Sequence, residues 1–382
     1  MRKYYTAESV TEGHPDKLCD QIADRVLDDC LSKDPDARVA CEAMTMGERV
    51  IVAGEITSTH IPRVPALVHQ VFEDAGYDPK TLLLDIYLRR QSPDITAGVN
   101  MSLEERNGTC KAGMGAGDQG IMVGYACSET PEKMPLAVVL AHRIAKRMAE
   151  VRKSGEIEGL MPDGKTQVTL EYEEDVPLRV DTIVVSAQHG AEIHRRRFER
   201  AIREQVLVPA LRPMPADGHT QILINPSGRF VLGGPTADTG LTGRKLAVDC
   251  YGVFAPNGGG ALSGKDATKV DRSGAYMARY IAKNIVAAGL AARCQVTLSY
   301  AIGKAQPVHV AVDTFGTGTA CEDDCLALAV RQVFDLTPSG MIQALGLTRP
   351  IFARTACYGH FGRTGFPWER EDRIRELKKA VL

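Results

Sequence analysis

The chain contains little tryptophan, few aromatic residues and almost no net charge. One tryptophan occurs among 382 residues, aromatic residues make up 5%, and the formal net charge is −2. A surface with so little net charge exerts no general attraction on nucleic acid or on an anionic membrane, so any anion site must be local. No apolar run approaches the length of a membrane span, and residues 1–10 lack the apolar centre of a signal peptide. We therefore expect a cytoplasmic protein without nucleic-acid or membrane partners.

Metal-binding cysteine patterns are also scarce, although the chain has ten cysteines. Cysteines in the cytoplasm are usually kept reduced. The spacings Cys321-x3-Cys325 and Cys357-x2-His360 resemble halves of zinc sites. However, Cys325 falls on the apolar face of a helix predicted from Asp323 to Phe334, so we expect no structural zinc site.

What the chain does contain is one order of elements repeated three times. Alternating and helical apolar patterns predict strand, helix, two strands, helix and strand over residues 4–88 and again over 120–224. A third block begins with a strand predicted at Leu246–Phe254. Three β-α-β-β-α-β units predict an α+β protein whose similar domains each lay helices on one face of a sheet. The predicted helices are Pro15–Leu31, Val64–Ala75, Leu136–Lys153, Ile193–Val208, Ser273–Ala288 and Asp323–Phe334. We assign domains to residues 1–98, 118–231 and 232–382, with a mobile loop at 99–117.

The stretch Gly258–Asp266 is the most informative segment. Four glycines and Ser263 let backbone N–H groups approach a ligand, and Lys265 adds a positive charge, which together predict a cradle for a polyphosphate. The spacing fits a Walker A motif, but Asp266 replaces the Ser or Thr that would hold magnesium, and helical periodicity begins only near Ser273. Asp266 must then face away from the phosphates or onto a metal. We expect a phosphate site unlike a P-loop, and a mobile Gly-rich surface loop is the alternative.

A second glycine cluster, Gly113–Gly120, ends a long polar segment that spans residues 91–117. Gly115–Gly120 matches the dinucleotide fingerprint, but a strand is predicted after it, whereas a Rossmann turn opens a helix. Asp118 therefore faces a polar ligand group or stabilises the turn. The segment 91–117 lacks hydrophobic periodicity and is predicted to be an active-site lid or a disordered loop.

The stretch Gly13–Lys17 predicts the start of a helix, since Pro15 suits the first helical turn. The positive end of this helix, with His14 and Lys17 beside it, would stabilise an anion. Asp16 could hold a magnesium that bridges to that anion, or could simply cap the helix. Three further aspartates on one face of this helix are expected to be solvated: Asp20, Asp24 and Asp28.

More cations follow polar turns, and each could be a ligand group or an ordinary surface charge. They are Lys165, Arg229, Arg244, Lys245 and Lys269, and Asp271 lies close behind the last of them. The basic run His194–Arg200 differs, because it lies within a predicted helix that has no glycine. We interpret that run as solvated surface.

Taken in order, these motifs resemble those of the S-adenosylmethionine synthetases (methionine adenosyltransferases), over nearly the whole chain. The matching stretches are Gly13–Lys17, Gly54–Thr57, Gly115–Gly120, Pro162–Lys165, Asn225–Phe230, Gly240–Lys245, Gly258–Asp266, Lys269–Arg272 and Tyr358–Arg363. The resemblance implies three α+β domains about a pseudo-threefold axis, in agreement with the repeat. It also implies synthesis of S-adenosylmethionine from ATP and L-methionine, with tripolyphosphate cleaved to diphosphate and phosphate before release.

The resemblance further implies site residues that suit this chemistry. A thioether needs no deprotonation, so the site must mainly stabilise charge on the departing tripolyphosphate and hold the reactants in line. The implied phosphate contacts are His14, Lys165, Arg244, Lys245 and Lys265. Other implied ATP contacts are Asp118, Asp163, Gly164, Arg229, Phe230 (against adenine), Asp238 and Ala261. The implied methionine contacts are Glu55, Gln91, Asp238 and Lys269.

The same resemblance implies metal ions and a subunit arrangement. Asp16 and Asp271 would hold magnesium, with two ions per site, and Glu42 would bind potassium. Active sites would lie between the two subunits of a homodimer, and dimers would pair into a homotetramer. The chain departs from the usual family pattern at Leu262, at Asn257 and in the length of segment 91–117.

Two other functions remain open at this point. A different ATP-hydrolysing enzyme could use the same cradle and cations without methionine. A nucleotide-sensing module would bind ATP without turnover, but would not need both Asp16 and Asp271 beside so many cations.

Overall fold

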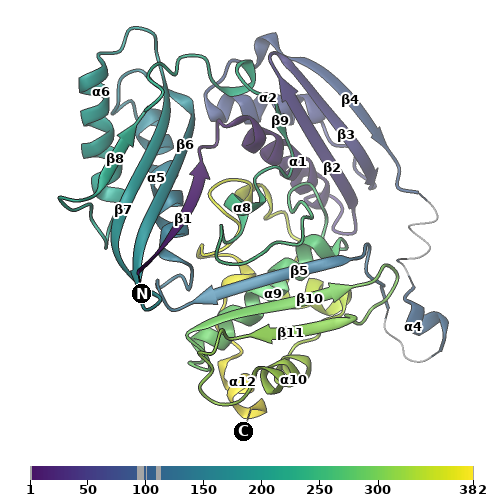
Figure 1. The fold of residues 1–382 in the computed structure, drawn as a ribbon. Coiled ribbons are helices and arrows are strands. Elements are labelled where there is room, and N and C mark those ends of the chain that lie inside the picture. Colours follow the sequence, from purple (N-terminus) through teal and green to yellow (C-terminus); the bar gives the residue numbers. More distant parts are fainter. Residues whose placement is uncertain (1, 93–98, 100, 109–112, 382) are drawn as a thin grey trace.

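The computed structural model describes residues 2–92, 99, 101–108 and 113–381. Three sheets surround a common centre and helices line their inner faces, so the fold is α+β as predicted (Figure 1). Much of the predicted lid, namely residues 93–98, 100 and 109–112, lies outside the described residues. The described part of that segment includes a short helix, α4 (Leu103–Arg106), whose first turn is capped by the Ser102 hydroxyl.

The first block follows its prediction closely. Its elements are β1 (Arg2–Val10), α1 (Pro15–Leu31), β2 (Arg38–Met46), β3 (Arg49–Thr57), α2 (Val64–Ala75) and β4 (Leu83–Arg89). Helix α1 begins at Pro15 because the side chain of His14 caps it and because proline suits the first turn. Helix α2 ends at Gly76, which adopts the left-handed conformation that favours glycine.

The second block has longer strands than the sequence predicts. It contains β5 (Gly120–Cys127), α5 (Leu136–Lys153), β6 (Leu160–Glu173), β7 (Val176–His189), α6 (Arg195–Ala201), α7 (Val208–Ala210) and β8 (Gln221–Ile224). A π-helical segment, Ile202–Leu207, joins α6 to α7. The α6 side chains are largely exposed, which confirms the interpretation of His194–Arg200 as surface.

The third block contains the main error of the sequence prediction. Its elements are β9 (Gly240–Leu241), α8 (Leu246–Asp249), α9 (Val270–Ala287), β10 (Arg293–Tyr300), β11 (His309–Asp313), α10 (Asp323–Val333), α11 (Pro338–Leu345) and α12 (Ile374–Ala380). The predicted strand Leu246–Phe254 is wrong, because these residues form α8 and a turn at Gly252. Val248 and Tyr251 are buried, so the apolar run reflects burial and not strand pairing.

Each block gives its first strand to the sheet of another block. The sheet orders are β1-β6-β7-β8, β11-β10-β5 and β4-β3-β2-β9. Pairing of Val10 with Lys165 places the end of β1, and hence the start of α1, beside the second block. Pairing of Thr45 with Gly240 places the third block's loop 240–245 on the first block's sheet. The exchange thus gathers loops from all three blocks near the start of α1.

One long helix of each block packs on the inner face of one sheet. Helix α1 packs on β2 and β9, α5 on β1 and β6, and α9 on β5 and β10. Along β2, Val39, Cys41 and Ala43 are buried on the α1 side, whereas Glu42 is exposed on the other side. Helix α8 lies between the three sheets (Figure 1). No helix of the described residues is long and apolar enough to cross a membrane.

Candidate active site

The start of α1 carries a neutral histidine. Nδ1 of His14 accepts a hydrogen bond from the Asp16 amide at 3.2 Å, and the side chain is buried. Burial lowers the pKa of His14 to about 3, and the nearby Lys245 and Lys165 act in the same direction. Because Nδ1 is the acceptor, the neutral ring carries its proton on Nε2. His14 can therefore donate a hydrogen bond to an anion.

Asp16 is an ionised carboxylate that touches the loop after β9. Its Oδ2 lies 2.5 Å from Nζ of Lys245, and its Oδ1 accepts a hydrogen bond from the Leu241 amide at 3.0 Å. Nε of Arg244 lies 3.7 Å from the same Oδ1. Burial opposes ionisation, but Lys245 and the Leu241 amide outweigh it and lower the pKa of Asp16. The structure thus brings together three predicted site residues of two blocks.

A second carboxylate, Asp163, lies at the start of β6 beside the exposed Lys165. Oδ2 of Asp163 accepts a hydrogen bond from the Gly234 amide at 2.8 Å, and among the described residues its buried Oδ1 has no partner. Burial raises the pKa of Asp163, and the exposed Asp238 adds to the rise. A Cβ on Gly164 would lie 3.1 Å from the Ser186 carbonyl oxygen and 2.7 Å from the flexible end of Met148, so glycine packs here without a shift of its neighbours. The sequence predicted all of these polar positions except the Gly234 amide.

The turn that carries Arg229 and Phe230 is fixed by Asn225, the first residue of its motif, and by Gln188, which the sequence analysis did not single out. The Asn225 side chain accepts from the Ala187 amide at 2.7 Å and donates to the Ala187 carbonyl oxygen at 2.9 Å. The Gln188 side chain accepts from the Asp163 amide and donates to the Val231 carbonyl oxygen, both at 3.1 Å. Gln188 therefore couples Asp163 to this turn.

The cradle Gly258–Asp266 needs its glycines partly for packing. A Cβ on Gly258 would lie 1.7 Å from the Ile121 carbonyl oxygen, and one on Gly260 would lie 2.2 Å from Oδ1 of Asp271. The cradle is thus pressed against the starts of β5 and α9. Lys265 forms an ion pair with Asp271. Ala261 touches the loop after β9, because a Cβ on Gly243 would lie 2.5 Å from its Cβ.

Asp266 faces away from the cradle. Its carboxylate accepts from the Val39 amide at 2.7 Å and the Thr268 amide at 2.9 Å, and it pairs with Lys269. Helix α9 begins at Val270, four residues later than a Walker A helix would begin. Both observations confirm that this segment is not a P-loop, and its binding of phosphate stays a prediction.

The other glycine cluster opens a strand, as predicted. Strand β5 begins at Gly120, so the dinucleotide fingerprint at Gly115–Gly120 has no helix to open. Oδ1 of Asp118 accepts from the Gln119 amide at 2.8 Å, and the side chain is exposed. The Gly117 amide donates to the Thr268 carbonyl oxygen at 3.3 Å, which sets Asp118 near the start of α9.

Three predicted residues lie away from Asp16 in this chain. Glu42 and Glu55 lie on the face of the β2–β3 pair that α1 does not cover. Oε1 of Glu55 accepts a hydrogen bond from Nε of Arg89 at 2.9 Å. The Gln91 amide donates to the Thr57 hydroxyl at 3.2 Å, at the end of the same strand.

The prediction that Asp20, Asp24 and Asp28 are solvated is wrong. Asp20 and Asp24 are fully buried, and they accept from the amides of Gly243 at 2.9 Å and Gly264 at 2.8 Å. Asp28 accepts from the amides of two residues before the Tyr358–Arg363 motif, at 3.0 and 2.8 Å. Together with Asp16 they form a column of four aspartates at i, i+4 spacing along α1. This aspartate column holds three loops in place. The sequence showed one face but could not show what covers it.

Two cations are buried with this aspartate column. Lys17 is fully buried and pairs with Asp20 and with Asp249, so it is not free to bind an anion as predicted. Arg272 forms two hydrogen bonds with Asp24, at 2.6 and 2.8 Å. Periodicity could not indicate this burial, because α1 has polar residues at 16, 17, 20, 21, 24, 25, 28 and 29 beside its apolar ones, as a half-exposed helix would.

The carboxylates available for a metal are single ones. Within residues 2–92, 99, 101–108 and 113–381, no group of three or more His, Cys, Asp or Glu side chains could hold an ion. Asp16 and Asp271 instead each pair with a lysine. One carboxylate per ion suits magnesium, which usually keeps several waters and binds through one or two carboxylates plus substrate phosphates.

Three family models match the chain. The N-terminal domain of S-adenosylmethionine synthetase matches residues 2–93, the central domain matches residues 113–230, and the C-terminal domain matches residues 232–370. The matches occur in chain order and cover nearly the whole sequence.

Proposed function

Since the chain belongs to the S-adenosylmethionine synthetase family, which makes S-adenosylmethionine from ATP and methionine, we propose that it also cleaves the tripolyphosphate product. Diphosphate and phosphate would then be released with S-adenosylmethionine. The observation that carries the proposal is the pairing of each candidate magnesium carboxylate with a candidate phosphate lysine. These pairs are Asp16 with Lys245 and Asp271 with Lys265.

The two pairs suit a site that is ready for a magnesium triphosphate. Without substrate, each lysine neutralises a carboxylate that would otherwise be a largely buried, unpaired charge. When substrate binds, phosphate oxygens can pair with the lysine, and a magnesium ion can bind the carboxylate. Magnesium, when bound, would neutralise charge on the departing tripolyphosphate. Lys165 and Arg244, which are exposed beside Asp163 and Asp16, would add positive charge.

His14 would act as a neutral hydrogen-bond donor in this reaction. Attack by the methionine sulfur on the 5′ carbon breaks the bond to the triphosphate oxygen, and no proton has to leave the sulfur. Negative charge therefore builds on the departing oxygen, and Nε2–H of His14 would stabilise it. A pKa of about 3 for His14 keeps the ring neutral, so it would donate without adding charge.

The remaining roles are proposed from the family resemblance and from local chemistry. The unpartnered Oδ1 of Asp163 could accept from a hydroxyl or amino group of the nucleoside, next to Gly164, Arg229 and Phe230. Ala261 and Asp118 would contact ATP from the cradle side. Glu55, Gln91, Asp238 and Lys269 would hold methionine, and Glu42 would offer an oxygen ligand to potassium.

A second copy of the chain would complete this site. Glu55 and Glu42 share the uncovered sheet face with exposed apolar side chains, among them Tyr87 at 67% exposure and Met46 at 57%. Apolar groups gathered on a sheet face favour a partner that covers them. We propose a homodimer that joins Glu55 of one copy to Asp16 of the other, with dimers pairing into tetramers in the cytoplasm.

One assay tests the proposal. The protein is incubated with ATP, magnesium and potassium, with and without methionine, and the products are identified by mass. We expect S-adenosylmethionine, diphosphate and phosphate only when methionine is present. Free tripolyphosphate as the final product would contradict cleavage before release. ADP formed without methionine would favour another ATP-hydrolysing enzyme, and unchanged ATP would favour a sensing module.

A further inference from the structure

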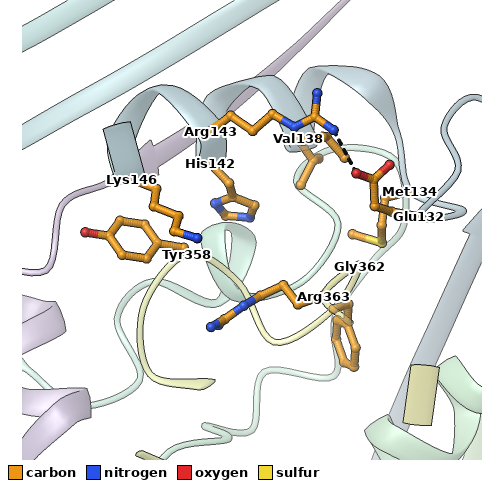
Figure 2. Close-up of a pocket in the computed structure, with 11 residues that line it drawn as sticks. Glu132, Met134, Val138, His142, Arg143, Lys146, Tyr358, Gly362 and Arg363 are labelled. Atoms are coloured by element: carbon orange, nitrogen blue, oxygen red, sulfur yellow. Dashed lines mark hydrogen bonds and ion pairs between the residues drawn. The ribbon is translucent and has the colours of Figure 1, made fainter. Parts of the chain in front are cut away.

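A cavity of about 160 Å³ lies between α5 and the segment 358–363 (Figure 2). None of the residues that line it is a proposed contact of ATP, methionine or metal. An apolar cavity of about 150 Å³ is large enough to bind benzene, so this one can hold a small organic molecule. Its apolar wall is formed by Met134, Val138, Val139 and Phe361.

Two cations at this cavity have no acidic partner. Among the described residues, Arg363 forms no ion pair, and its guanidinium donates only to the carbonyl oxygens of Cys357 and Gly359, at 2.9 and 3.1 Å. Burial lowers the pKa of Arg363. Lys146 is exposed and likewise lacks an ion pair within the described part of the chain. Both side chains therefore leave positive charge at the cavity.

The opposite wall provides an unpartnered carboxylate oxygen, and Nε2 of His142 and the Tyr358 hydroxyl, which also line the cavity, likewise have no partner in the described residues. Oε1 of Glu132 pairs with Nη2 of Arg143 at 2.7 Å, as the dashed line in Figure 2 shows. The buried Oε2 of Glu132 has no partner in the described residues. His142 adds no charge, because burial lowers its pKa to about 3. The cavity is thus lined by three cations and one carboxylate, and that carboxylate still needs a hydrogen-bond donor.

We propose that this cavity binds a small aliphatic hydroxy acid. The carboxylate of the acid would pair with Lys146 and Arg363. Its hydroxyl would donate a hydrogen bond to Oε2 of Glu132, and its hydrocarbon part would pack on Val138 and Phe361. A hydroxyl fits better than an ammonium group, because Arg143 already balances the charge of Glu132 and three cations surround the cavity. The site is separate from the proposed reaction and does not depend on it.

Matched probes test the chemistry by calorimetry on the full chain. They are 2-hydroxy-3-methylbutanoate, its neutral amide, 3-methylbutanoate and valine. We expect the hydroxy acid to bind about tenfold more tightly than the amide, and a few-fold more tightly than 3-methylbutanoate, since charged hydrogen bonds contribute more than neutral ones. Equal affinity of acid and amide would overturn the proposal, and tighter binding of valine would overturn the hydroxyl assignment.

Variants test the location. Lys146→Gln and Arg363→Gln should each weaken the hydroxy acid about tenfold and leave the amide unchanged. Arg196→Gln, on the exposed part of α6, is the matched control. If Arg363→Gln does not fold, Lys146→Gln still decides, because Lys146 is exposed. Unchanged affinity in Lys146→Gln, or displacement of the probe by ATP with a methionine analogue, would contradict binding in this cavity.

Discussion

Ion pairs of similar chemistry occupy two environments along and beside α1. In the interior, Arg272 with Asp24 and Lys17 with Asp20 have no exposed side-chain surface. At the open end, Lys245 is 17% exposed over Asp16, and beside the cradle Lys265 is 22% exposed over Asp271. The fully buried pairs can only stabilise the fold, whereas the partly exposed pairs can exchange partners with a substrate. Access of the cation to solvent, and not charge, separates the structural ion pairs from the proposed catalytic ion pairs here.

The largest expected effect is the loss of stability on breaking a fully buried ion pair. Asp24→Asn leaves the Arg272 guanidinium buried without a counter-charge, so the free energy of unfolding should fall by about 3–5 kcal/mol. Denaturant unfolding measures the loss. Asp36→Asn, on the exposed turn after the helix, should change stability by less than about 0.5 kcal/mol. A loss that small for Asp24→Asn would show that the pair is not needed for stability.

The next largest effect is the loss of reaction rate on breaking a partly exposed ion pair. Lys265→Met should reduce the rate of S-adenosylmethionine formation by about 10²–10³, because it removes a preorganised charge from the departing phosphates. The unfolding free energy should fall by much less than in Asp24→Asn, because Lys265 and Asp271 both keep some contact with water. Lys80→Met, at an exposed site, is the control. A near-normal rate for Lys265→Met would remove the cradle from the mechanism.

Lowering the pH should reduce the stability of the folded chain through His14, which is buried at the start of α1. The folded pKa of His14 is about 3, below its ordinary value, so only the unfolded chain takes up this proton as pH falls below about 6.5. Its contribution to stability is therefore lost with falling pH. The stability of the wild type relative to His14→Gln should drop by up to about 1.4 kcal/mol per pH unit between pH 6 and 5. Urea unfolding at several pH values measures it, and a pH-independent difference would mean that His14 titrates normally.

The smallest expected effect concerns Asp16. Asp16→Asn keeps an acceptor for the Leu241 amide but loses the charge for magnesium, so the magnesium concentration for half-maximal rate should rise several-fold. Titration of the initial rate with magnesium measures the shift. Chelation of the wild type should stop the reaction without lowering the melting temperature, because the metal would bind with substrate. Melting that collapses on chelation would indicate a structural metal.

Much of the local structure could be predicted from the sequence. The observed bounds of α1, α2 and α5 are the predicted ones, because capping residues, proline and apolar periodicity act within a few residues. The cradle and its late helix were predicted for the same reason. The predicted strand Leu246–Phe254 failed because Val248 and Tyr251 are buried in a short helix and a turn, and burial alone favours apolar side chains without strand pairing.

The sequence by itself determined which residues carry positive charge beside flexible turns, and it indicated the family through motifs spread over three blocks. Tertiary structure alone decided that each block gives its first strand to another sheet, and that aspartates of α1 hold the loops of Gly243 and Gly264. These contacts join residues more than two hundred positions apart in the chain. Short-range patterns cannot encode which distant amide meets a carboxylate, because that choice depends on how the sheets pair and pack.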